Sequence, residues 1–299
     1  MERARCGLKV IGLAVVLALG AGTAAVAQSP APQSPRRVVS LNMCTDQLLL
    51  DLVQPERIAA ISYLGADVTL SAYAEELNRF KKLRGTAEEV LALEPDLIIA
   101  GEYTTGATVD LLRRVGRNVV VVPMATDFEG MRATVRQIAA AVGETARGEE
   151  VLKNFDDRLR AARSTVQSRP TALAYQVGSF VSGPESLLDA AMTAAGYRNL
   201  AHDLKLGDGG RLPLEQLLTT PPDLLVLANA ADDFRTVLAD NLRHPALRQA
   251  MQNRPSVHLP MPYWMCATPK IAEAVEILAS MKATGLAQHT PESSAGHPQ

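Results

Sequence analysis

The sequence predicts an α/β fold with two lobes of mostly parallel sheet, joined by one long rigid helix. Three observations support this prediction. The chain has 299 residues, enough for two domains, and short apolar runs alternate with helical patterns along it. Two of its segments also resemble each other at a fixed offset. Because hydrophobic residues make up 47% of the chain, each lobe can bury a core.

The N-terminal segment predicts export. Three basic residues precede an uncharged apolar stretch, Val10–Gly22, and an A-x-A cleavage pattern follows at residues 25–27. A membrane anchor is the alternative interpretation, but the apolar stretch is interrupted by small residues and is at the short limit for a spanning helix. We therefore expect a signal peptide over residues 1–27 and a protein of the periplasm that is soluble after cleavage.

The remainder of the chain divides into regions by composition. Residues 28–35 are rich in Pro, Ser and Gln and are expected to be a disordered lead-in, and residues 289–299 a disordered tail. Between them we expect an N-terminal lobe over residues 36–145, a linker helix over 146–168 and a C-terminal lobe over 169–288. The expected strands, in chain order, are Arg37–Leu41, Ile58–Ile61, Leu97–Ala100, Val119–Val122, Ala172–Val177, Leu224–Leu227 and Val257–Leu259. These runs do not alternate between apolar and polar residues, which is typical of parallel strands buried on both faces.

The predicted linker helix shows apolar residues at helical spacing, with charged residues on its other face. The apolar positions are Val151, Leu152, Phe155, Leu159 and Ala162. A flexible hinge is typically richer in Gly and Ser, so this composition favours a stiff connection.

The self-similarity of the chain has an offset of 127 residues. It aligns EEVLALEPDLIIA, beginning at Glu88, with EQLLTTPPDLLVLA, beginning at Glu215. Each copy predicts a short helix, a Pro-Asp turn and a buried strand. Thr86-x-x-Glu89 is a capping-box pattern for the first helix, and Pro213 is suited to open the second.

The order of these elements resembles the periplasmic binding proteins that serve vitamin B12, ferric siderophore and haem importers. The resemblance covers about residues 36–287, and its motifs are specific through their order and spacing. The stretches that carry it are RVVSLNMCTDQLLLDL at Arg37–Leu52, the two E-x₇-PDL copies, PESLLDAAMTAAGYRNLA at Pro184–Ala201 and YWMCATPKIAEAVEILA at Tyr263–Ala279.

This resemblance implies two α/β lobes with the ligand in the cleft between them, and a non-enzymatic role. It implies delivery of an iron-siderophore, cobalamin or haem-type chelate to the permease and ATPase of an ABC importer at the inner membrane. It also implies that Glu88 and Glu215, one in each lobe, dock the permease. Acidic residues in the first turn of a helix also simply favour its positive end, and that interpretation stays open. We expect a monomer without a cofactor of its own, whose metal arrives inside the ligand.

Loops that follow the carboxyl ends of the expected strands hold the candidate ligand contacts, because ligands of α/β folds bind there. The family also implies an aromatic contact at Tyr263. The candidates are Asn42, Met43, Cys44, Thr45, Tyr63, Glu102, Tyr103, Phe180, Tyr263 and Trp264.

Cys44 and Cys266 fall on predicted mouth loops of opposite lobes and are absent from the B12-binding pattern. A disulfide across the cleft, two thiols that touch the ligand and two unrelated buried cysteines are the possible interpretations. We favour the disulfide, since an oxidising compartment permits pairing.

Composition and motifs also bear on other functions. With 30 basic and 32 acidic residues, no basic field for nucleic acid is expected. A periplasmic hydrolase and a bare metal-ion-binding protein remain alternatives, although the chain has no G-x-S-x-G motif and no paired His spacing for a metal. Anionic siderophores call for cations in the cleft, and only Arg211 and Arg235 are candidates, which favours a neutral or bulky apolar chelate.

Overall fold

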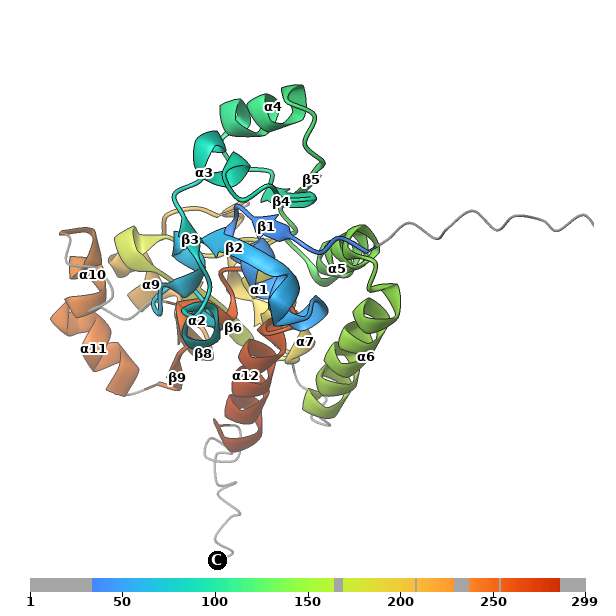
Figure 1. Cartoon of the computed structure of the whole chain (residues 1–299). Helices are drawn as coiled ribbons and strands as arrows, with labels where there is room; N and C mark the ends of the chain where they lie inside the picture. Colours follow the sequence, from blue (N-terminus) through green and yellow to red (C-terminus); the bar gives the residue numbers. More distant parts are fainter. Residues whose placement is uncertain (1–33, 164–168, 208, 229–236, 253, 286–299) are drawn as a thin grey trace, which may run out of the picture. The chain divides into compact units, whose positions relative to one another are not determined.

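A computed structural model gives the structure of the chain (Figure 1), and it describes residues 34–163, 169–207, 209–228, 237–252 and 254–285. The predicted signal peptide, the predicted tail, Arg235 and all of the lead-in except Ser34 and Pro35 lie outside the described residues. None of the described helices is both long enough and apolar enough to cross a membrane.

The first lobe is built on a sheet of parallel strands in the order β3-β2-β1-β4-β5. Its strands are β1 (Val38–Ser40), β2 (Ile58–Ser62), β3 (Lys82–Leu83), β4 (Leu97–Gly101) and β5 (Val119–Val122). Its helices are α1 (Met43–Leu52), α2 (Ala74–Leu77), α3 (Ala87–Leu91), α4 (Gly106–Arg114) and α5 (Phe128–Val142), with 3₁₀ turns η1 (Pro55–Arg57) and η2 (Tyr63–Ala66).

The second lobe has a parallel sheet in the order β7-β6-β8-β9. Its strands are β6 (Thr171–Tyr175), β7 (Arg198–Asn199), β8 (Leu224–Leu227) and β9 (Ser256–His258). Its helices are α7 (Leu187–Ala194), α8 (Leu200–Asp203), α9 (Leu214–Thr219), α10 (Asp240–Arg243), α11 (Pro245–Gln252) and α12 (Ile271–Gly285), with 3₁₀ turns η3 (Val177–Ser179), η4 (Val237–Ala239) and η5 (Met261–Tyr263). The predicted two-lobe α/β fold with parallel sheets is confirmed.

The expected strands match the structure except at a few ends. The expected run through Val177 was too long, since β6 ends at Tyr175 and the chain turns at Gly178, where φ is +69°. Such a backbone conformation is readily adopted by glycine and cannot continue a strand. The sequence pattern also missed β3 and β7. Each has only two residues and lies at the edge of its sheet, too short to show a period.

Helix α6, Thr145–Ala162, connects the two lobes and packs against α5 of the first lobe and α12 of the second (Figure 1). An ion pair ties it to each neighbour. Arg132 of α5 pairs with Asp156, and Arg158 pairs with Glu276 of α12, with 2.7 Å between Nε and Oε1. The helix is therefore held along its length by both lobes, as expected for a stiff connection.

The two lobes share one hydrophobic core. Successive residues of the strands point to opposite faces of each sheet. In β4, Leu97 belongs to the shared core and Ile98 to a separate cluster on the outer face, while in β8, Leu224 and Leu225 divide in the same way. Helices α1, α5, α6, α7 and α12 contribute to the shared core. The described residues from Ser34 onward accordingly form one compact unit.

The sequence repeat corresponds to matching structure in the two lobes. Asp96, in the Pro-Asp turn before β4, accepts hydrogen bonds from the backbone N–H groups of Arg36 and Arg37 at 2.7 and 3.0 Å. Asp223, before β8, accepts from the backbone N–H and the hydroxyl of Thr171 at 2.7 and 2.8 Å. Each repeated aspartate thus fixes the start of the neighbouring central strand.

Candidate functional site

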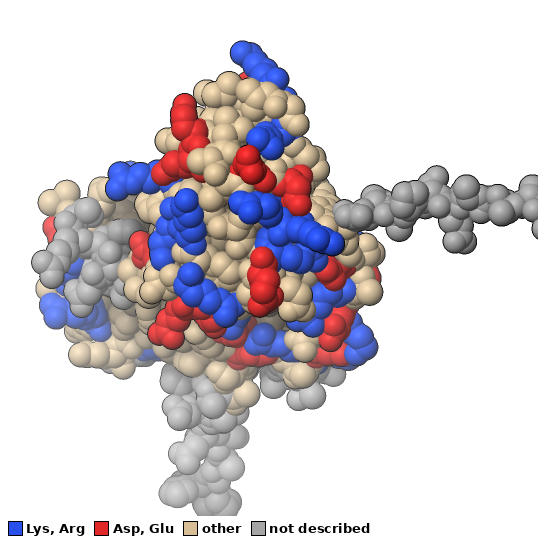
Figure 2. Space-filling model, in the orientation of Figure 1, with Lys and Arg blue, Asp and Glu red and all other residues tan. Residues whose placement is uncertain are grey.

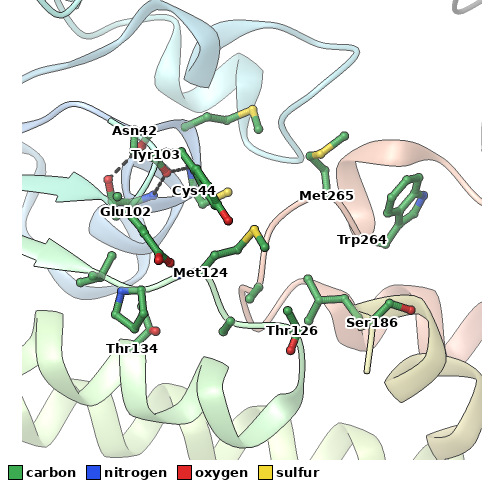
Figure 3. A pocket seen from close by; sticks show the side chains of 18 of the residues that line it. Asn42, Cys44, Glu102, Tyr103, Met124, Thr126, Thr134, Ser186, Trp264 and Met265 are labelled. Atoms are coloured by element: carbon green, nitrogen blue, oxygen red, sulfur yellow. Dashed lines mark hydrogen bonds between the residues drawn. The ribbon is translucent and has the colours of Figure 1, made fainter. Parts of the chain in front are cut away.

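A cavity of about 640 Å³ opens at the carboxyl ends of β1, β4 and β5. Its size falls within the range of small-molecule sites. In Figure 3, Asn42, Glu102 and Tyr103 lie on one side of it, Trp264, Met265 and Ser186 on the other, and Met124 between them. The lining residues are Asn42, Met43, Cys44, Thr45, Leu48, Gly101, Glu102, Tyr103, Val122, Pro123, Met124, Ala125, Thr126, Thr134, Ser182, Glu185, Ser186, Leu187, Leu188, Trp264, Met265 and Ala267.

The start of helix α1 forms a fixed wall of the cavity. Asn42 caps the helix, because its side-chain oxygen accepts from the backbone N–H groups of Cys44 and Thr45 at 2.9 and 3.4 Å. The Thr45 hydroxyl in turn donates to the Asn42 carbonyl at 2.9 Å and lies 2.7 Å from the hydroxyl of Ser40. A side chain at Gly101 would approach the Asn42 amide to 2.8 Å, so glycine allows the two segments to meet.

A disulfide joins the two lobes beside the cavity. Cys44, at the start of α1, is bonded to Cys266, and their Cα atoms are 5.2 Å apart. Cys266 is buried, while Cys44 lines the cavity. Gln47 donates a hydrogen bond from Nε2 to the Cys266 sulfur at 3.3 Å. Of the three interpretations left open by the sequence, the structure forms the disulfide.

The loops after β4 and β5 are tied to each other at the rim. Glu102 accepts a hydrogen bond at Oε2 from the backbone N–H of Met124, at 3.0 Å. The Thr104 hydroxyl accepts from the Gly101 N–H at 3.0 Å, which closes the turn that presents Tyr103. Tyr103 is 75% exposed, so its ring is available to a ligand or a partner.

Thioether side chains give the cavity much of its apolar character. Met43 comes from the start of α1, Met124 from the loop after β5, and Met265 from the loop after η5. The flexible, polarisable Met side chain adapts to ligands of irregular shape. Trp264 packs on the shared core and also lines the cavity, with its indole N–H donating to the Leu259 carbonyl at 3.4 Å.

The second lobe contributes the loop that leads into α7. Ser186 caps this helix by accepting from the Asp189 N–H at 3.2 Å. Glu185, the residue before it, has a φ of +62°, in the left-handed region that costs a non-glycine residue about 1–3 kcal/mol. Strained residues of this kind cluster at functional sites.

A buried carboxyl group stands behind the α1 wall. Asp46 is fully buried, and it accepts at Oδ1 from the Ser62 N–H at 3.2 Å. Its Oδ2 packs against Gly65 and has no hydrogen-bond partner among the described residues. Burial raises the pKa of Asp46 well above its usual value, although hydrogen bonds with Ser40 and Ser62 act in the opposite direction. Asp46 therefore supports the fold of this wall and does not reach the cavity.

Seven of the ten predicted ligand contacts line the cavity: Asn42, Met43, Cys44, Thr45, Glu102, Tyr103 and Trp264. Tyr63, Phe180 and Tyr263 do not. Tyr63 follows β2, which is one strand farther from the cavity, and Phe180 lies under the guanidinium of Arg211, 4.7 Å from its ring centre. Tyr263 packs on the shared core. Arg211 is likewise absent from the lining. Ligand binding by any of these residues stays a prediction.

The cavity residues after β5 and before α7 are not among the ligand contacts expected from the sequence. The loop after β5 follows a strand that was expected, so the carboxyl-end rule already indicated Pro123, Met124, Ala125 and Thr126. Glu185 and Ser186 follow a bend within the second lobe instead of a strand end, and no sequence period indicates them.

Glu88 and Glu215 occupy matching positions away from the cavity. Each is exposed in the first turn of its helix, α3 or α9. The capping box predicted for α3 is present, since Thr86 and Glu89 bond reciprocally. Figure 2 shows basic and acidic side chains mixed over the face in view. Within the described ranges, neither glutamate forms an ion pair, and no group of three or more His, Cys, Asp or Glu could hold a metal.

Curated relatives match part of the chain. A cobalamin-binding protein of Halobacterium salinarum is 26% identical over 203 residues, covering 66% of this chain and 55% of its own. A putative ABC transporter substrate-binding lipoprotein of Bacillus subtilis, YhfQ, is 24% identical and covers 68% of each. The chain thus spans about half the length of the halobacterial relative.

Solved structures share the fold. The periplasmic haem-binding protein RhuT of Roseiflexus sp. RS-1 superposes with a TM-score of 0.69 at 23% identity, covering 82% of this chain and 97% of its own. The vitamin B12 binding protein BtuF of Vibrio cholerae gives 0.64 at 17% identity, covering 86% and 100%. A model of the periplasmic binding protein family matches residues 38–261, most of the chain. The chain therefore belongs to the periplasmic binding protein family.

Proposed function

We propose that this protein captures a metal chelate in the cavity between its lobes and delivers it to the permease of an ABC importer. The observation that carries the proposal is the cavity of about 640 Å³ that both lobes line and that the disulfide between them flanks. Relatives named for cobalamin, haem and ABC-transporter substrates support the class of ligand. On this proposal the protein is a carrier without a catalytic step, and the metal is cargo inside the chelate.

The proposed site of action is the periplasm, after removal of residues 1–27. The disulfide supports this location, because disulfides form and persist in oxidising compartments. The basic n-region, apolar stretch and A-x-A pattern of the N-terminus support it independently.

Docking to the permease is proposed to use Glu88 and Glu215. Both carboxylates are exposed, one on each lobe, at equivalent positions of the repeat. Exposed ion pairs contribute only about 0.2–1 kcal/mol each, so such docking is weak and reversible. Weak docking suits a monomeric carrier that must leave the importer after delivery.

Ligand capture is tested by intrinsic fluorescence, because the only Trp of the chain, Trp264, lines the cavity. The protein without residues 1–27 is titrated with cobalamin, haemin and a panel of ferric siderophores. We expect saturable quenching at micromolar concentration or below by one class of chelate. Calorimetry on the same panel provides a readout that does not depend on Trp264, and the absence of binding by both methods would refute the proposal.

Docking is tested by charge reversal at both positions, Glu88→Lys with Glu215→Lys. Uptake of the identified chelate is expected to fall at least about tenfold, while the affinity of the isolated protein for the chelate stays unchanged. Glu75→Lys is the matched control, since Glu75 is also exposed in the first turn of a short helix of the first lobe. Normal uptake by the double variant would remove these residues from the docking surface.

A further inference from the structure

The charged residues that line the cavity are all acidic. Among the described residues of the lining, only Glu102 and Glu185 carry a formal charge, and no Lys, Arg or His is present. Both glutamates are exposed, and neither forms an ion pair within the described part of the chain. A ligand in this cavity therefore meets carboxylates that no neighbouring cation neutralises.

The two carboxylates come from opposite lobes. Glu102 follows β4 in the first lobe, and its Oε2 is held by the Met124 N–H at 3.0 Å. Its other oxygen accepts no hydrogen bond from the described residues and is available to a ligand. Glu185 precedes α7 in the second lobe, at a left-handed backbone position with a φ of +62°. A ligand that spans the cavity can thus contact one acceptor on each side.

The two arginines expected from the sequence as cleft candidates, Arg211 and Arg235, do not change this balance. Arg211 is engaged with the Phe180 ring at 4.7 Å and does not line the cavity. Residues 229–236, which lie outside the described residues, contain two Asp and one Arg by sequence and add no net positive charge.

The other lining side chains favour a bulky ligand with a polarisable body. Met43, Met124 and Met265 supply thioether surface from three separate segments. Thr134 is 4% exposed, and its hydroxyl lacks a hydrogen-bond partner within the described ranges. The ionised carboxylates of Glu102 and Glu185 only accept hydrogen bonds, so the complementary ligand groups are N–H or O–H donors.

We propose that the cavity takes a chelate of neutral or positive charge with hydrogen-bond donors at its periphery, and that Glu102 and Glu185 exclude anionic chelates. Like charges that meet in a partly desolvated site repel strongly, which gives discrimination of about tenfold or more. This inference rests on the proposed function, because it specifies the ligand class of the same cavity.

Matched pairs of chelates test the selectivity directly. The first two pairs share a metal and a macrocycle but differ in charge: dicyanocobinamide with dicyanocobyrinic acid, and haemin dimethyl ester with haemin. The third pair, a neutral ferric hydroxamate with an anionic ferric catecholate, shares only the metal and differs in charge. Dissociation constants are measured by calorimetry at low and high salt. We expect the less anionic member of the pair that binds to be tighter by about tenfold or more, with a smaller preference at high salt because salt screens the repulsion.

The double variant Glu102→Gln with Glu185→Gln assigns the selectivity to these residues. Gln keeps the size of Glu and an oxygen for the Met124 N–H, so the fold is expected to stay intact, as its Tm verifies. The preference for the less anionic member is expected to fall about tenfold. Glu75→Gln, an exposed substitution away from the cavity, is expected to leave it unchanged.

Two results would overturn the inference while the carrier function stands: tighter or equal binding of the anionic member by the native chain, and an unchanged preference in the double Gln variant. If no member of any pair binds, the proposed function itself fails, and the inference fails with it.

Discussion

The two lobes begin alike and then diverge. In each, a repeated aspartate, Asp96 or Asp223, fixes the first residues of a central strand, β1 or β6. After β1 the chain enters helix α1 directly, and the start of this ten-residue helix walls the cavity. After β6 it turns through η3 at Gly178, and the cavity residues of that lobe come later, before α7.

This difference shows where the binding site arises in a repeated architecture. The matching helices, α3 and α9, lie outside the cavity lining and carry the exposed Glu88 and Glu215. Most of the lining comes from segments that the repeat does not duplicate. The repeat therefore accounts for helices and strands that the lobes have in common, and the segments in which the lobes differ form most of the cavity lining.

Loss of the Cys44–Cys266 disulfide between the lobes is expected to have the largest effect on the free energy of unfolding. Replacement of Cys44 and Cys266 by Ser removes a cross-link between residues 222 positions apart, with an expected cost of about 5 kcal/mol on the loop-entropy model. Because the lobes share one core, we expect a single unfolding transition in denaturant to persist. Two separate transitions would show that the lobes are independent once the bond is absent.

Each lobe buries an ionisable side chain, an acid in the first and a base in the second, and the pH dependence of the acid sharpens the comparison. The first lobe buries Asp46, whose pKa is raised by burial, and the second buries Lys282, whose Nζ donates to the Gly196 carbonyl at 3.1 Å. A carboxyl group with a raised folded pKa contributes stability below its unfolded value near 3.8, and this contribution is lost as pH rises through the folded pKa.

Asp46→Asn removes this titration. Relative to the native chain, the variant is expected to gain stability as pH rises from 4 to 7, by about 1–3 kcal/mol, the cost of a buried group without its partner. The Tm of both proteins across this range measures the difference. A difference that stays constant with pH would show that Asp46 does not titrate in this window.

The repeated aspartates allow a direct test of equivalence between the lobes. Asp96→Ala and Asp223→Ala each remove two hydrogen bonds to the start of a strand, at an expected cost of about 1 kcal/mol each, because both sites are exposed to water. Replacement by Asn, which keeps an acceptor oxygen, is the matched control. Unequal costs in denaturant unfolding would show that the repeat is structural in only one lobe.

The smallest expected effect on stability concerns the N-terminal caps of α3 and α9, the helices that precede the repeated strands β4 and β8. Helix α3 has the capping box of Thr86 and Glu89, whereas α9 begins after Pro213 without a side-chain cap. Thr86→Ala is expected to cost about 0.5–1 kcal/mol. Hydrogen exchange should locate the loss in α3 and leave α9 unchanged, and equal loosening of both helices would contradict a local cap.

Local sequence patterns predicted the helices and strands of the two lobes well, and the residues that line the cavity less well. Buried parallel strands such as Leu97–Gly101 are visible as apolar runs, and strand ends then indicate Asn42 and Glu102. Glu185 escaped notice because its place depends on how the second lobe folds against the first, which no local pattern records. Phe180 was expected at the cavity from its position after β6, but it forms an antiparallel bridge with Arg211 and does not line the cavity.

The shared core makes the cavity mechanically stiff. Each 100 Å² of apolar surface exposed by spreading the lobes costs about 2.5 kcal/mol, several times the thermal energy. Wide opening is therefore rare without external work, and the cross-link from Cys44 to Cys266 restricts it further. A ligand that fills the cavity is expected to leave slowly on its own, so the time it stays bound depends on whether another protein forces the lobes apart.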